Sequence, residues 1–128
     1  MDRRTALISI AAVGTLDRVA SFGARALVPG RGEALTTPEK VARGIAETRA
    51  FLEDVFRIAR EGAAADQPLK QVYDRALQDL RPKYGHWVIF DHCMPFDVTR
   101  ALDEATGHAD PRIWTAERDM QMWRSLES

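Results

Sequence analysis

The residues best suited to chemistry lie close together in the second half of the chain, at His86, Trp87, Asp91, His92 and Cys93. Imidazole, thiolate and carboxylate groups are common metal ligands and also bind polar substrates. The two histidines are six positions apart, an even separation that places both on one face of an extended segment. No third ligand completes a recognised metal-binding pattern, however, and neighbouring His92 and Cys93 would point to opposite faces. We therefore expect no metal site in this chain and treat these five residues as substrate-binding candidates.

The single cysteine could also serve as a nucleophile. Cys93 would then need a base, and His86 or His92 could supply one only if the chain turned back on itself. A cysteine in an apolar sequence is more simply interpreted as a small buried hydrophobic side chain. The sequence therefore identifies no catalytic residue.

A sixth candidate is Arg31, in the turn Pro29-Gly30-Arg31-Gly32. Glycines on both sides allow positive φ and a close approach of the backbone to a ligand. At the end of a strand, this guanidinium could bind a carboxylate or a phosphate in a cleft. The alternative is a solvated turn residue.

Composition narrows the class of protein. The chain has 128 residues, with 18 Lys and Arg against 19 Asp and Glu. This near-neutral balance provides no basic surface for nucleic acid, which we do not expect as a partner. No apolar run is long enough to span a bilayer, and one cysteine cannot form an internal disulfide. A cytoplasmic location suits these features.

The N-terminus offers a second localisation. Arg3 and Arg4 precede the apolar stretch Thr5–Val13, a pattern typical of a twin-arginine export signal. Cleavage near Ala24-Arg25-Ala26 would then release a periplasmic protein. The alternative is that this stretch belongs to an amphipathic first helix.

The remaining pattern is mainly that of helices. Apolar residues recur at helical spacing from Leu16 to Phe22 and predict a first helix, which Gly23 would end. Residues Ala24–Val28 are then predicted to form one short strand. Beyond Thr37, which would cap a helix, four helices are expected: from Pro38 to about Glu61, from Leu69 to about Arg81, from Pro95 to before Gly107, and from Thr115 onward. We therefore predict a mainly α fold with about four to five helices. Five aromatic residues should form its core or line a cleft: Trp87, Phe90, Phe96, Trp114 and Trp123.

Several of these segments together resemble a known family. They are Leu16–Ala20, Val28–Gly32, Leu35–Glu39, Gly85–Trp87, Pro95–Val98 and Asp110–Asp119. From about residue 15 to the end, the chain resembles the C-terminal region of bacterial metallo-β-lactamase-fold hydrolases. The block Trp114-Thr115-Ala116-Glu117-Arg118-Asp119 is its most specific part.

The resemblance implies a division of the chain. Residues 1–14 do not match, residues 15–37 would be the last helix, strand and turn of a metallo-β-lactamase-like core, and residues 38–128 would be a helical C-terminal domain. The family holds zinc or another divalent metal with an early His-x-His-x-Asp-His motif, which this sequence lacks. Arg31 also stands where many members have a histidine ligand, and arginine cannot coordinate a cation.

The resemblance thus implies a helical tail without catalysis of its own and without its own cofactor. It would pack on a catalytic core and line the substrate entrance of that core, so a catalytic-domain partner or a second copy of the chain is expected. One alternative is a small helical protein-binding or self-associating module, which would use Trp87, Phe90 and Phe96 as an exposed patch. The other is the exported protein described above.

Overall fold

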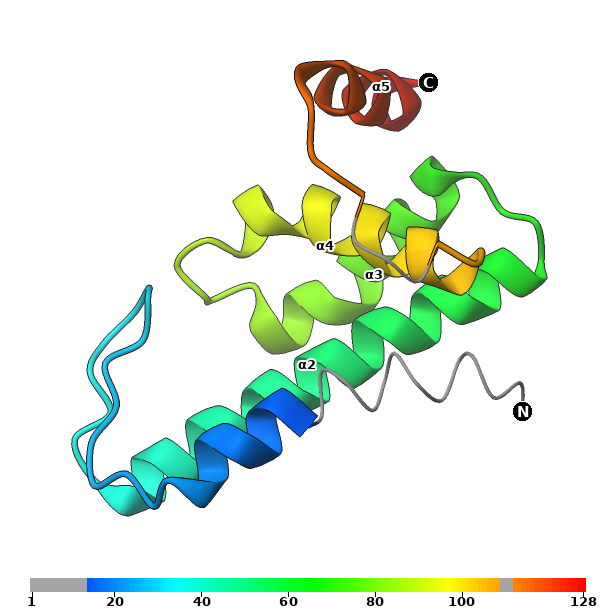
Figure 1. The fold of residues 1–128 in the computed structure, drawn as a ribbon. Helices are drawn as coiled ribbons and strands as arrows, with labels where there is room; N and C mark the ends of the chain where they lie inside the picture. The colour runs from blue at the N-terminus through cyan, green and yellow to red at the C-terminus, as the bar shows by residue number, and fades with distance from the viewer. Residues whose placement is uncertain (1–13, 109–111) are drawn as a thin grey trace.

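The computed structural model describes residues 14–108 and 112–128 and is mainly helical, as predicted. Its labelled helices are α2 (Pro38–Ala64), α3 (Leu69–Tyr84), α4 (Phe90–Ala105) and α5 (Ala116–Glu127), and residues 14–21 are also helical (Figure 1). Among the described residues, no helix is both long and apolar enough to cross a membrane. The twin-arginine pattern and Asp110 lie outside the described residues.

Helix α2 is the longest element and begins where the sequence predicted. The Thr37 hydroxyl accepts a hydrogen bond from the Lys40 amide at 3.2 Å, and Pro38 occupies the first helical turn. Its buried stripe follows the helical period: Val41, Phe51, Val55, Ile58, Ala59 and Gly62. At 27 residues, the helix is about 40 Å long. It continues three residues beyond the predicted end, because alanines at 63 and 64 favour helix over a break.

Helices α2, α3 and α4 pack against one another around one apolar core. The largest fully buried side chains in this core are Ile58, Leu80, Met94, Val72, Val98 and Pro95. A short turn at Asp66, whose φ is +51°, joins α2 to α3 as an antiparallel pair. Asp54 also links these two helices, because its carboxylate accepts hydrogen bonds from Lys83 at 3.0 Å and Tyr84 at 3.3 Å.

Helix α5 lies beyond α3 and α4, away from α2 (Figure 1). Thr115 caps it, as predicted, by accepting a hydrogen bond from the Arg118 amide. Met122 and Leu126 are buried, whereas Trp123 is 43% exposed. Of the five aromatic residues expected in the core or at a cleft, Phe90 is buried, Trp87 and Phe96 are half-buried, and Trp114 is 40% exposed.

The segment from residue 14 to residue 37 packs along the first half of α2 (Figure 1). Gly23 has a φ of +58° and ends the first helical segment, as predicted. The expected strand Ala24–Val28 is wrong: only Leu27 pairs, through two 2.8 Å hydrogen bonds with Leu35. These two residues form an isolated antiparallel bridge, because no further strand of the described chain lies beside them to extend it.

Two helix ends also differ from prediction, both at prolines. Helix α3 continues through Pro82, and α4 begins at Phe90, so Pro95 lies inside it. A proline removes one amide donor from a helix, and packing of the surrounding turns overrides that loss here. The extended segment expected from His86 to His92 is therefore wrong. Residues 85–89 form a short turn, and His92 belongs to the first turn of α4.

Candidate functional site

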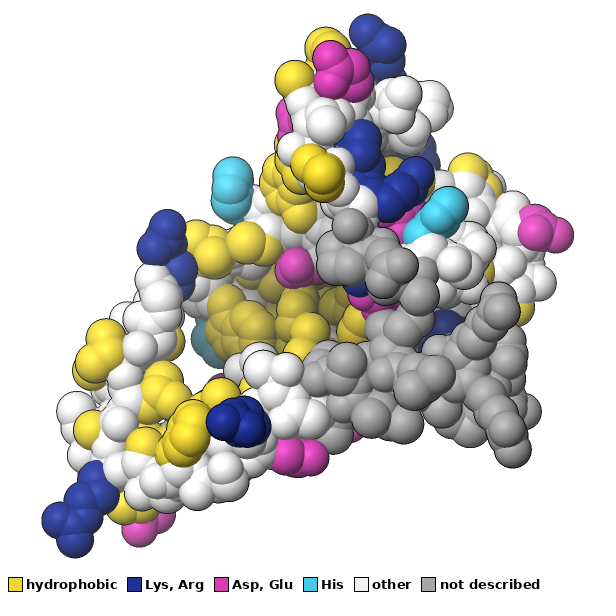
Figure 2. Space-filling model, viewed as in Figure 1, with side chains coloured by type: hydrophobic (Ala, Val, Ile, Leu, Met, Phe, Trp, Pro, Cys, Tyr) yellow, Lys and Arg dark blue, Asp and Glu magenta, His cyan; other side chains and the backbone are white. Residues whose placement is uncertain are grey.

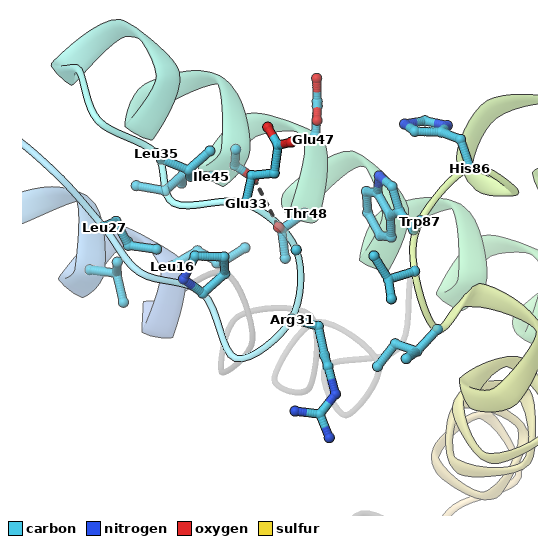
Figure 3. Close-up of a pocket in the computed structure, with 16 residues that line it drawn as sticks. Leu16, Leu27, Arg31, Glu33, Leu35, Ile45, Glu47, Thr48, His86 and Trp87 are labelled. Atoms are coloured by element: carbon cyan, nitrogen blue, oxygen red, sulfur yellow. Dashed lines mark hydrogen bonds between the residues drawn. The ribbon is translucent and has the colours of Figure 1, made fainter.

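An open cavity of about 680 Å³ lies between the 14–37 segment, the first half of α2 and the loop before α4 (Figure 3). We call it the cleft. Its lining comes from the helical segment 14–21, the turn between Leu27 and Leu35, helix α2 and the loop before α4. Figure 2 shows this face of the molecule hollowed, with hydrophobic side chains gathered in the hollow. Segments far apart in sequence therefore form one site, which has the size of a typical small-molecule pocket.

The wall of the cleft is mostly apolar. Leu16, Leu27, Leu35 and Ile45 contribute to it from the 14–37 segment and α2. On the opposite side, Trp87 is held by aromatic contacts, with ring centroids 5.1 Å from Phe51 and 4.9 Å from Tyr84. These two tilted ring contacts fix the indole against the core.

Charged groups occupy opposite sides of the cleft. Figure 3 shows Glu33 and Glu47 on the side of His86, whereas the Arg31 side chain points the other way. The Nη1 atom of Arg31 donates a hydrogen bond to the carbonyl oxygen of Gly30, in its own turn, at a distance of 2.9 Å. Within residues 14–108 and 112–128, neither glutamate nor Arg31 has an ion pair. Both carboxylates and the remaining donors of Arg31 are therefore open to a ligand.

The structure brings together three of the six predicted site residues: Arg31, His86 and Trp87 all line the cleft. Asp91, His92 and Cys93 do not line it, because they lie on the first turn of α4. Asp91 pairs with Arg81 at 2.6 Å, and the His92 ring lies 5.9 Å from the Phe96 ring.

The Cys93 thiol is half-buried and has no disulfide partner. Burial raises the pKa of this thiol, the carboxyl of Asp97 raises it further, and the charge of Arg31 lowers it. A thiol with a raised pKa is a poor nucleophile at neutral pH. The packing role of Cys93 is therefore the better interpretation.

Asp97 was not predicted from the sequence as a site residue. It lies one turn after Cys93 on α4, is half-buried, and receives no hydrogen bond or ion pair from any residue that the structure describes. Burial raises the pKa of its carboxyl from 3.8 to about 6. The apolar sequence around it, with Pro95 and Val98, was the available signal of this environment.

Asp103 is a second missed residue, and it joins α4 to the start of α5. Its buried carboxylate accepts hydrogen bonds from Arg112 Nε at 3.1 Å and from Arg118 Nη2 at 2.7 Å. Arg118 also donates to the carbonyl of Arg112 at 3.0 Å and lies 4.7 Å above the Trp114 ring. We call this group the Asp103 clamp. Arg112 thus pairs with a carboxylate of α4, nine positions before it in the sequence.

The residues of the cleft do not fit a metal ion. In the described ranges, no three His, Cys, Asp or Glu side chains lie close enough together to hold one. The turn where the resembled family often has a histidine carries Arg31, which keeps its proton and cannot coordinate a cation.

Comparison with known proteins gives no assignment. No protein-family model matches this chain, and no curated protein is significantly similar to it.

Proposed function

We propose that this chain is a non-catalytic helical module, similar to the C-terminal region of metallo-β-lactamase-fold hydrolases, that docks on a catalytic core and lines its substrate entrance. The observation that carries the proposal is the unfinished β-pairing at Leu27. In the part of the chain that the structure describes, only the side of Leu27 that faces Leu35 is hydrogen-bonded. A stable sheet needs several paired strands, and one bridge provides a single pair of residues. The unpaired edge of a strand can therefore accept hydrogen bonds from, and donate them to, another strand.

The outer edge of this bridge is available to a partner. In an antiparallel pair, the residues flanking a bonded position direct their N–H and C=O groups outward. These residues are Ala26 and Val28, and within the described chain neither makes a backbone hydrogen bond. Val28 is also 83% exposed. An extended strand of a catalytic core could add here and bury this side chain.

Three exposed apolar side chains also favour docking of a catalytic core at this face. Phe22 and Val28 lie on the 14–37 segment, and Val88 lies on the loop at the other wall; all are at least 70% exposed. A core that added a strand at Val28 would cover this rim while leaving the cleft between the two parts. The cleft would then form part of a substrate entrance.

The test is complementation between this chain and a hydrolase of the resembled family that is truncated before its last helix, strand and turn. Sedimentation velocity should show a one-to-one complex with the full chain. Val28→Asp should abolish the complex, because it places a charge at the new pairing edge. Ile113→Asp is the matched control, since Ile113 is equally exposed at 83% but lies far along the chain. Absence of a wild-type complex, or equal loss with both variants, would contradict the proposal.

A second candidate function is self-association through the C-terminal segment. Ile113, Trp114, Met120 and Trp123 are all at least 40% exposed, and exposed apolar groups of this kind favour protein contacts. Sedimentation of the chain alone distinguishes the two candidates. A dimer that Ile113→Asp dissociates, and Val28→Asp leaves intact, would favour self-association.

A further inference from the structure

We propose that the cleft binds an elongated apolar carboxylate, with its head group at Arg31 and its hydrocarbon chain along the wall formed by Leu16, Ile45 and Trp87. Ligand binding in the cleft does not require a catalytic core to dock beside it.

The size and construction of the cleft favour a small molecule. Its volume of about 680 Å³ falls within the range of ligand sites, and four separate parts of the chain contribute to its walls. The wall residues meet across the space and do not fill it. An apolar chain of several carbons would remove these side chains from water, and each buried methylene should raise affinity about fourfold.

The head group is assigned by Arg31. Among the described residues, its guanidinium makes one hydrogen bond, to Gly30 of its own turn, which leaves most of its five donors open to a ligand. Arg31 is exposed, so a ligand can reach the fork of the guanidinium. A carboxylate matches that fork with two parallel hydrogen bonds.

The acidic side chains of the cleft fix the direction of binding. Glu33 and Glu47 lie on the side away from the Arg31 guanidinium (Figure 3). An anion would be repelled at that side and attracted at the other. The carboxylate therefore lies at Arg31, and the end of the hydrocarbon chain lies toward the glutamates.

The test uses octanoate, octanol and octylamine as probes of equal length, with isothermal titration calorimetry on the full chain. We expect octanoate to bind most tightly. Arg31→Gln should weaken octanoate by roughly tenfold and change octanol less than twofold, because only the charged pair is lost. Arg25→Gln is the matched control, since Arg25 is an exposed arginine of the same segment that does not line the cleft.

Two further measurements complete the test. Decanoate should bind up to about sixteenfold more tightly than octanoate, as expected for two more buried methylenes. Glu47→Gln should leave octanoate binding unchanged or slightly stronger. Tightest binding of octylamine with loss in Glu47→Gln would overturn the proposal, as would no octanoate binding or equal weakening by Arg25→Gln. None of these results depends on the complex that Val28→Asp tests.

Discussion

Replacing Asp97 with asparagine should stabilise the protein at neutral pH. In the folded chain, burial raises the pKa of this carboxyl from 3.8 to about 6, and no described residue compensates the charge. A raised folded-state pKa means that folding favours the protonated form. The contribution of Asp97 to stability is therefore fully present below about pH 4 and is lost as the pH rises through 6.

The magnitude follows from the size of the shift. A shift from 3.8 to about 6 corresponds to at most about 3 kcal/mol, at roughly 1.4 kcal/mol per pKa unit. Partial solvent access at this half-buried site should reduce the effect to about 1–2 kcal/mol. Asparagine has nearly the same shape as aspartate and stays neutral. The free energy of unfolding of Asp97→Asn should therefore not fall by this amount as the pH rises.

The assay is urea unfolding of both proteins at about pH 4 and about pH 8. The free energy of unfolding of the wild type should fall relative to that of Asp97→Asn between these two values. Asp91→Asn is a control on the same helix, because Asp91 is exposed and paired with Arg81. Parallel pH dependence of the wild type and Asp97→Asn would refute this account of Asp97.

Three other substitutions, one of them with a matched control, test an ion-pair cluster, a helix cap and the apolar core. Asp103→Asn should lower the free energy of unfolding by about 1–3 kcal/mol, because it leaves the two arginines of the Asp103 clamp without their carboxylate. Amide hydrogen exchange should then become faster first in α5. Thr37→Ala should lower the free energy of unfolding by about 1 kcal/mol through loss of the α2 cap, whereas Thr36→Ala should leave it nearly unchanged; urea unfolding measures both. Leu80→Ala should lower the free energy of unfolding by about 2–5 kcal/mol in the same assay, because Leu80 is fully buried between the helices. A loss below about 1 kcal/mol would show that neighbouring side chains move to fill the space left by the leucine.

Local signals in the sequence predicted much of the fold. Thr37 and Thr115 mark two helix starts correctly, since a capping hydroxyl acts within its own turn. The apolar stripe of α2 also follows from spacing alone. Pro82 and Pro95 misled the prediction, because packing of neighbouring turns decided where those helices end and begin.

The candidate site was less predictable, because its parts meet only in the folded chain. Arg31 and His86 were both singled out as candidates, yet no spacing rule indicates that they line one cavity. Asp97 and Asp103 are both aspartates on α4. Within the described ranges, Asp97 has no ion-pair partner, whereas Asp103 is bound by two arginines, and this difference depends on residues distant in sequence.

Helix α2 carries two regions that depend on it differently. Its second half, from Phe51 onward, is buried in the core, whereas its first half supports the 14–37 segment through contacts such as the Asp17–Arg49 ion pair. The two halves share one continuous ladder of backbone hydrogen bonds. Opening of the cleft segment can therefore occur as a local event while the core remains folded, but loss of the core removes the support on which the segment rests. In a hydrogen-exchange experiment, the amides of Leu27 and Leu35 should thus exchange at a low opening free energy, and those around Ile58 should exchange only with global unfolding.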